Sequence, residues 1–260
     1  MRGILFDLDG VFYVGDTPVP GGAETLAWVR ANAIPHLFLT NTTSRPRAAI
    51  AKKLRGFGIE AQVGEILTPP VAAVRWIRAH VGGGAALFVP EVTRAEFDEL
   101  ETVPLEGSAS AAAVVVGDLG EGWDFPTLNR VFRLLMQSPP PALIALGMTR
   151  YWRAPDGLRL DVGAYVSALE FASGVRPVVL GKPAAAFYET ALALLGCRAD
   201  DTVMIGDDIR GDIGGALTAG IDAVLVRTGK FRAGDLESDI SPTAVLDSVA
   251  ALPAWWASRR

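Results

Sequence analysis

Two aspartates stand two residues apart at the end of an apolar run, in the segment Phe6-Asp7-Leu8-Asp9-Gly10. Residues i and i+2 of an extended chain share a face, so both carboxylates are expected to point the same way. Like charges placed that close are unfavourable unless a cation or a shared proton relieves them. The pair therefore indicates a metal site, an acid/base device, or both. The plainer alternative is an Asx turn that only ends a strand.

A second acidic cluster follows another apolar run, with Asp207, Asp208 and Asp212 inside one predicted strand-to-helix turn. Negative charge near a helix N-terminus explains one or two such residues. It does not explain three after a buried strand. Mg²⁺, a hard cation that prefers oxygen ligands, is the partner that this cluster favours.

Two further features suit a phosphate. Thr40 and Asn41 begin a hydroxyl- and amide-rich loop between a predicted strand and a helix start, where side chains and free N–H groups can donate to phosphate oxygens. Lys182 stands between Gly181 and Pro183, which fixes its direction. Taken alone, ordinary capping explains the first feature and a plain surface loop explains the second.

The elements that position these residues alternate between short apolar runs and longer helical patterns, which is the signature of α/β architecture with a parallel sheet. Each of the four features lies at the carboxyl end of a predicted strand, the edge where parallel sheets bind ligands. The predicted strands are Ile4–Leu8, Ile34–Leu39, Ala86–Val89, Ala113–Val116, Ala142–Leu146, Val178–Leu180, Thr202–Ile205 and Ala223–Val226.

The middle of the chain has its own βαβ rhythm, which predicts an inserted domain rather than loops. We therefore expect a Rossmann-like parallel-sheet core built from residues 1–68 and 178–260, interrupted by a large α/β cap over residues 69–177. Ser44, before Arg45 and Pro46, is the expected N-cap of a core helix, and another helix is expected near Ile209–Ala219.

Composition narrows the function classes. The 260 residues are 50% hydrophobic and 20% charged, with a net charge of −5, which argues against a basic nucleic-acid footprint. No apolar run approaches the roughly 20 residues of a membrane helix. The lone Cys197 excludes an intramolecular disulfide, and two isolated histidines, His36 and His80, do not assemble a zinc site. A cytoplasmic enzyme without nucleic-acid or membrane partners is the expectation.

In order and placement, the four features resemble the four motifs of the haloacid dehalogenase (HAD) superfamily. The insert between the second and third resembles the α/β cap of subfamily IIA. Within it, the chain is most similar to the phospholysine phosphohistidine inorganic pyrophosphate phosphatase group. The matching segments are Arg94–Asp98, Leu146–Tyr151, Leu160–Gly163, Val203–Asp208 and Val226–Phe231.

This resemblance implies a phosphatase in which Asp7 attacks phosphorus and forms an aspartyl-phosphate. Asp9 is implied to be the general acid that protonates the leaving group, then the base that activates water. Mg²⁺ would be held by the carboxylate of Asp7, the backbone carbonyl of Asp9 and Asp207, with Asp208 and Asp212 as supporting residues.

Thr40 and Asn41 would donate hydrogen bonds to the phosphoryl group, and Lys182 would neutralise it. Some relatives on this branch have serine where Asp9 stands. The carboxylate retained here favours an ordinary phosphomonoester over a phosphoamide. The substrate is a small phosphorylated molecule whose identity the residues leave open.

The cap is expected to supply specificity, through Arg150, Tyr151 and Trp152 and through the loop Gly117–Glu121. An asparagine-aspartate signature found in the cap of other subfamily members is absent around Met148–Trp152. Cap core or a contact between caps is the alternative role for these residues, and the resemblance is compatible with a homodimer through the cap.

Two other functions stay open at this stage. A phosphotransferase or mutase on the same fold would pass the phosphoryl group to a second substrate instead of water. A non-catalytic phospho-ligand-binding module would keep the fold without the reaction, although the intact Asp7, Asp9, Lys182 and Asp207 argue against it. A dehalogenase is disfavoured, since that chemistry does without the second carboxylate and the metal.

Overall fold

The computed structural model describes residues 2–105, 110–154 and 156–259, and the chain forms two compact units. Unit 1 consists of Met1–Thr40, Arg47–Leu67 and Lys182–Arg260, and unit 2 consists of Asn41–Pro46 and Thr68–Gly181. That the core and cap are domains with boundaries at 68/69 and 177/178 stays a prediction.

Unit 1 is built on a six-stranded sheet in which every neighbouring pair is parallel. Its two central strands are buried throughout and therefore read as continuous apolar runs in the sequence. In spatial order the strands are β14 (Ala244–Leu246), β13 (Asp222–Val226), β12 (Thr202–Gly206), β1 (Gly3–Asp7), β4 (His36–Leu39) and β5 (Ile66–Leu67).

One face of this sheet forms a hydrophobic core with three helices. Ile4 and Phe6 of β1 alternate toward that face, and the rings of Phe6, Phe12 and Phe38 pack edge-on or stacked with centroids 5.2 to 6.0 Å apart. The helices that cover it are α1 (Gly22–Ala31), α2 (Arg47–Gly56) and α8 (Leu252–Ala257). A short hairpin of β2 (Tyr13–Val14) and β3 (Thr17–Pro18) follows β1 directly.

The remaining helices of unit 1, α6 (Ala185–Leu195) and α7 (Gly215–Thr218), contact β4 and β13 respectively. The structure confirms the extent of one predicted helix and corrects the start of another. The helix expected near Ile209–Ala219 is a π-helix over Ile209–Gly214 followed by α7, because the N–H groups of both Asp212 and Ile213 bond to the carbonyl of Asp208. The helix expected to be capped by Ser44 begins only at Arg47.

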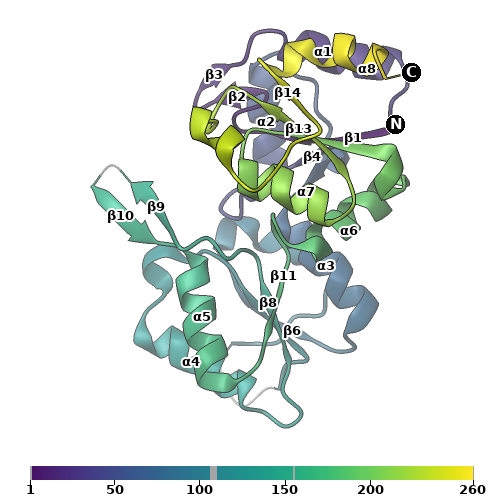
Figure 1. Ribbon diagram of the computed structural model, residues 1–260. Coiled ribbons are helices and arrows are strands. Elements are labelled where there is room, and N and C mark those ends of the chain that lie inside the picture. Colours follow the sequence, from purple (N-terminus) through teal and green to yellow (C-terminus); the bar gives the residue numbers. More distant parts are fainter. Residues whose placement is uncertain (1, 106–109, 155, 260) are drawn as a thin grey trace. The chain divides into compact units, whose positions relative to one another are not determined.

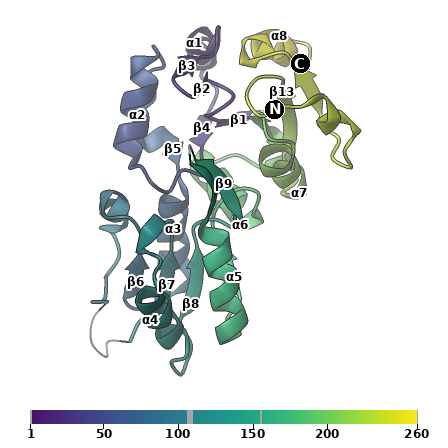
Figure 2. The ribbon, with the colours of Figure 1, turned by 90° about the vertical axis from the view of Figure 1, so that its left-hand side faces the viewer.

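Unit 2 contains a parallel four-stranded sheet with α4 (Phe125–Leu135) and α5 (Val162–Ser173) on one side and α3 (Pro69–His80) on the other (Figures 1 and 2). An antiparallel hairpin, which the sequence reasoning missed, precedes α5. The sheet strands, in order, are β11 (Pro177–Val179), β8 (Ala142–Ala145), β7 (Ala113–Val116) and β6 (Ala85–Phe88), and the hairpin strands are β9 (Tyr151–Ala154) and β10 (Gly157–Leu160).

The strand predicted at Val178–Leu180 as part of the core sheet corresponds to β11, which pairs with β8 of unit 2 instead. An apolar run predicts that a strand exists but not which sheet it joins. No helix within residues 2–105, 110–154 and 156–259 has the length and apolar character that crossing a membrane requires.

Candidate active site

The two acidic motifs meet because β1 and β12 are parallel neighbours. Phe6 pairs with Ile205, so Asp7 at the end of β1 lies level with the end of β12, where Asp207 follows. Asp212, from the π-helix, joins them. Oxygen atoms of the three carboxylates lie within 4.8 Å of one another, and all three residues are buried, at 7%, 1% and 1% exposure. We call these three residues the carboxylate cluster.

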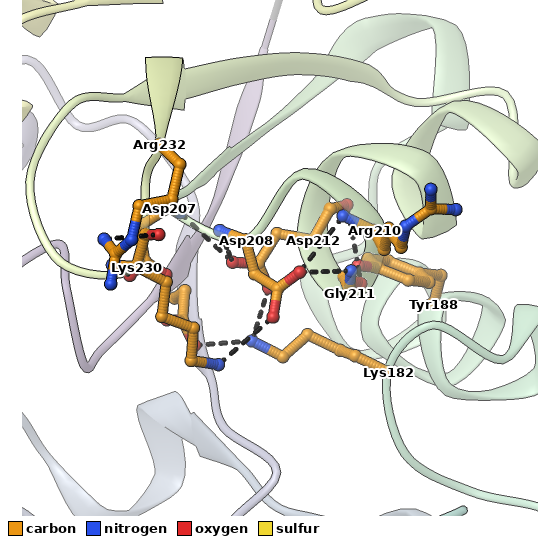
Figure 3. A network of polar contacts seen from close by, with 10 residues as sticks. Lys182, Tyr188, Asp207, Asp208, Arg210, Gly211, Asp212, Lys230 and Arg232 are labelled. Carbon is orange, nitrogen blue, oxygen red and sulfur yellow. Dashed lines mark hydrogen bonds and ion pairs between the residues drawn. The ribbon is translucent and has the colours of Figure 1, made fainter. Parts of the chain in front are cut away.

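Lys182 is the cation of this cluster. Its Nζ atom lies 2.5 Å from Asp7 Oδ1 and 2.6 Å from Asp212 Oδ1, and the residue is buried (Figure 3). Burial by itself lowers the pKa of the ammonium, but the carboxylates of Asp212 and Asp7 outweigh it and raise the pKa. Lys182 therefore stays charged and holds two of the three carboxylates in place.

One ammonium does not neutralise three carboxylates, and the ionisation of the cluster reflects that. Burial raises the pKa of Asp7 to about 8, with the charges of Asp212 and Asp207 adding to it and Lys182 opposing. Burial also raises the pKa of Asp207 to about 6, against a hydrogen bond from the backbone of Lys230. The cluster therefore has more negative charge than Lys182 alone can balance.

A divalent cation fits that deficit. Asp207 Oδ2 accepts a hydrogen bond of 2.6 Å from Lys230 N, whereas the buried Oδ1 atom finds no hydrogen-bond partner in the described part of the chain. A buried carboxylate oxygen left unpaired is costly. Because the available metal ligands are hard carboxylate oxygen atoms, Mg²⁺ suits the carboxylate cluster.

The backbone after β12 is shaped by the other acidic side chains. Asp212 Oδ2 accepts from the N–H groups of Asp207 and Asp208, at 3.2 Å each. Asp208 caps the π-helix through Arg210 N and Gly211 N and pairs with Lys230 Nζ at 3.1 Å. Of the two residues predicted as supporting, Asp212 thus belongs to the carboxylate cluster and Asp208 caps the helix beside it.

A segment after β13 completes the site, although the sequence reasoning assigned it no role. A Cβ atom at Gly10 (φ +93°) or at Gly229 (φ +65°) would collide with the Asp207 carboxylate, so both positions require glycine. Thr228 Oγ1 donates to the carbonyl of Gly10. The signal was available, since Thr228-Gly229-Lys230 follows a strand end as the other motifs do.

Asp9 has a different environment from Asp7. Asp7 is buried whereas Asp9 is exposed, so the two carboxylates have different surroundings. Strand β1 ends at Asp7, and Asp9 instead forms an isolated bridge with Tyr13. The rule that residues i and i+2 of a strand share a face therefore does not apply to Asp9. The side chain of Asp9 lies outside the carboxylate cluster.

The predicted phosphate-binding residues fall in both units. Thr40 is buried in unit 1, and its N–H donates to the carbonyl of Leu67 at 3.1 Å. Asn41 belongs to unit 2, where a Cβ atom at Gly181 would lie 3.2 Å from Asn41 Oδ1. Their roles stay predictions.

Unit 2 has a pocket of its own, of about 350 Å³. Trp123 and Tyr165 stack in its wall with ring centroids 5.3 Å apart, and the half-exposed Trp152 comes from β9. Arg150 and Tyr151, predicted with Trp152, do not line it. The lining residues are Asp118, Gly120, Glu121, Trp123, Trp152, Arg159, Leu160 and Tyr165.

Family comparisons agree with this arrangement. Residues 4–102 match the family described as haloacid dehalogenase-like hydrolase, and residues 179–252 match a related family described as HAD-hydrolase-like. The chain belongs to the haloacid dehalogenase-like hydrolases, and it is an enzyme of the HAD-type phosphatases. The resemblance inferred from the four motifs is confirmed.

Particular relatives lie close in sequence and in structure. The chain is 38% identical over 244 residues to phospholysine phosphohistidine inorganic pyrophosphate phosphatase from Bos taurus, covering 90% of this chain and 86% of the relative. It is 37% identical to haloacid dehalogenase-like hydrolase domain-containing protein 2 from Bos taurus, covering 95% and 91%. The p-nitrophenyl phosphatase from Archaeoglobus fulgidus superposes with a TM-score of 0.87 at 27% identity, covering 98% of each chain.

Proposed function

We propose that this chain is a Mg²⁺-dependent phosphatase that hydrolyses a small phosphorylated substrate through an aspartyl-phosphate on Asp7. The carboxylate cluster is the observation that carries the proposal. Three buried carboxylates, with one ammonium and an Asp207 oxygen atom that has no hydrogen-bond partner among the described residues, are a costly arrangement unless a cation is bound.

Asp7 and Asp207 would hold Mg²⁺, together with the backbone carbonyl of Asp9. When bound, the cation would supply positive charge that lowers the pKa of the aspartates and offsets repulsion between Asp7 and an anionic substrate. Asp212 would orient the site, because its oxygens accept from Lys182 Nζ and from two backbone N–H groups.

The chemistry follows from the two environments of the first motif. Asp7, ionised and held by Lys182, would attack phosphorus while Asp9 gives its proton to the departing oxygen or nitrogen. Water would then attack the aspartyl-phosphate, Asp9 would take the water proton, and phosphate and Asp7 would be released. Asp9 is left as a carboxylate by the first step, which is the form needed to take the water proton in the second, and that transfer restores its acid form for the next turnover.

Thr40, Asn41 and Lys182 would bind the phosphoryl oxygens. The substrate would be a phosphomonoester, pyrophosphate or phosphoamide, a range supported by the names of the relatives. Residues of the unit 2 pocket, Trp152 among them, would select the leaving group. A homodimer through unit 2 and a cytoplasmic location stay predictions.

The test is phosphate release from a panel of p-nitrophenyl phosphate, pyrophosphate, imidodiphosphate, nucleoside monophosphates and sugar phosphates, with and without EDTA and added Mg²⁺. Release without any acceptor, lost in EDTA and restored by Mg²⁺, is expected. Acid quenching during turnover, followed by peptide mass spectrometry, should place a phosphoryl group on Asp7. Metal-independent release would contradict the cation site, and release only with an acceptor would identify a phosphotransferase.

A further inference from the structure

The Asp9–Gly10 turn is attached to the β2–β3 hairpin that follows it. Gly10 N donates to the carbonyl of Tyr13 at 2.6 Å, and Asp9 forms its bridge with the same residue. Tyr13 and Val14 pair in turn with Pro18 and Thr17. A hairpin of two residues per strand is marginal alone, so its position depends on what it contacts.

One side chain from another part of unit 1 makes several of those contacts. Lys53 on α2 directs Nζ to the carbonyl of Gly15 at 2.6 Å and to Asp16 Oδ1 at 3.1 Å. The same ammonium lies 4.5 Å from the centroid of the Tyr13 ring and 5.8 Å from that of Phe57, and these two rings are 5.6 Å apart.

The contacts of Lys53 differ in how strongly they hold the hairpin. The Asp16 side chain is 98% exposed, so its ion pair with Lys53 contributes little. The hydrogen bond to the Gly15 carbonyl holds the hairpin tip. The ammonium over the Tyr13 ring holds Tyr13, the residue that bonds to Gly10 and forms the bridge with Asp9. The contacts therefore run from α2 through Tyr13 to Asp9.

We propose that Lys53 is a positioning residue for catalysis, which holds the β2–β3 hairpin against α2 and thereby fixes the carboxyl group of Asp9 for proton transfer. This rests on the proposed function in one respect, the acid/base role of Asp9. Lys53 itself touches no reacting group. Small displacements of a catalytic group lower the reaction rate strongly, so loosening the hairpin should slow the step that needs the Asp9 proton.

The test compares two substrates in their kcat/KM. p-Nitrophenolate leaves readily without a proton, whereas an alkoxide needs one. In Lys53→Met, kcat/KM should fall about tenfold for an alkyl phosphate and less than about threefold for p-nitrophenyl phosphate. Lys53→Arg, which keeps the donor and the cation, should recover most of the loss. The matched control is Lys52→Met, an exposed lysine next along α2, which should behave as wild type.

Asp9→Asn, measured in parallel, separates this proposal from the function on which it rests. Suppose that Asp9→Asn lowers kcat/KM more for the alkyl phosphate than for p-nitrophenyl phosphate. If Lys53→Met then lowers kcat/KM equally for both substrates, or for neither, the positioning role is overturned. If Asp9→Asn shows no discrimination, the acid role of Asp9 fails and the Lys53 proposal fails with it. Lys53→Gln carries the same test should the Met variant not fold by circular dichroism.

Discussion

The carboxylate cluster of unit 1 and the pocket of unit 2 both use loops at the carboxyl ends of parallel strands, yet their charged residues differ in burial. In unit 1, charged groups are buried, and each carboxylate is fixed by Lys182 or by backbone N–H groups. In unit 2, charged groups line an open pocket beside the half-exposed ring of Trp152 and the buried ring of Trp123, and the side chain of Arg159 is 48% exposed.

This difference matches the proposed division of roles, with the chemistry in unit 1 and substrate selection in unit 2. Buried charges interact strongly, so the free-energy changes on protonation and on cation binding are large. Exposed charges are screened, so the exposed charged residues of the unit 2 pocket can change at little cost to stability. Changes in the carboxylate cluster should therefore affect turnover and metal binding, and changes in the pocket should affect substrate preference.

The largest effect is expected for Asp7→Asn. The variant keeps the shape but removes the nucleophile, so turnover should fall at least about 10³-fold in phosphate-release assays. Asp16→Asn, an exposed aspartate of the same unit, is the matched control and should stay within about twofold of wild type. Activity of Asp7→Asn near the wild-type level, with an unchanged circular dichroism spectrum, would show that Asp7 is not the nucleophile.

A smaller effect is expected for Asp207→Asn, which removes a charged oxygen donor from the cluster. The Mg²⁺ concentration for half-maximal activity should rise about 10- to 100-fold, measured by titrating the metal at saturating substrate. Partial recovery at high Mg²⁺ would support a ligand role. The same loss at every Mg²⁺ concentration would instead place Asp207 outside the metal site.

The pH dependence of stability follows from the same charges. In the metal-free protein the pKa values of Asp7 and Asp207, about 8 and about 6, lie above the ordinary value of 3.8, so the folded state holds protons that the unfolded chain releases. This contribution to stability is full below about pH 4 and is lost as the pH rises toward 8. Mg²⁺ should therefore raise the melting temperature on the order of 5 °C more at pH 8 than at pH 5, by calorimetry. An equal shift at both values would contradict the assignment.

The smallest effect is expected in unit 2. Trp152→Ala removes an aromatic wall of the pocket and should raise KM for the best substrate about three- to tenfold with little change in kcat. Leu158→Ala is the matched control, because this exposed residue of the same hairpin does not line the pocket. A large fall in kcat for Trp152→Ala would break the separation between chemistry and selection.

The α/β class, most of the strands and the two acidic motifs follow from the order of residues alone. Apolar runs such as those that became β1 and β12 specify strands buried on both faces, and an aspartate at the end of such a run has few structural explanations. The motif order also determined the family. Local pattern was sufficient for these inferences because each depends on residues close together in the chain.

Which residues share an environment became evident from the three-dimensional fold. It placed Asp212 with Asp7 and Lys182, left Asp9 exposed, paired β11 with β8 and attached the β2–β3 hairpin to Lys53. These outcomes depend on strand order, on where a strand stops and on contacts between residues such as Asp7 and Lys182, which are far apart in the chain. A one-dimensional pattern carries no information on such pairings, because the free energy that selects them comes from packing the whole unit.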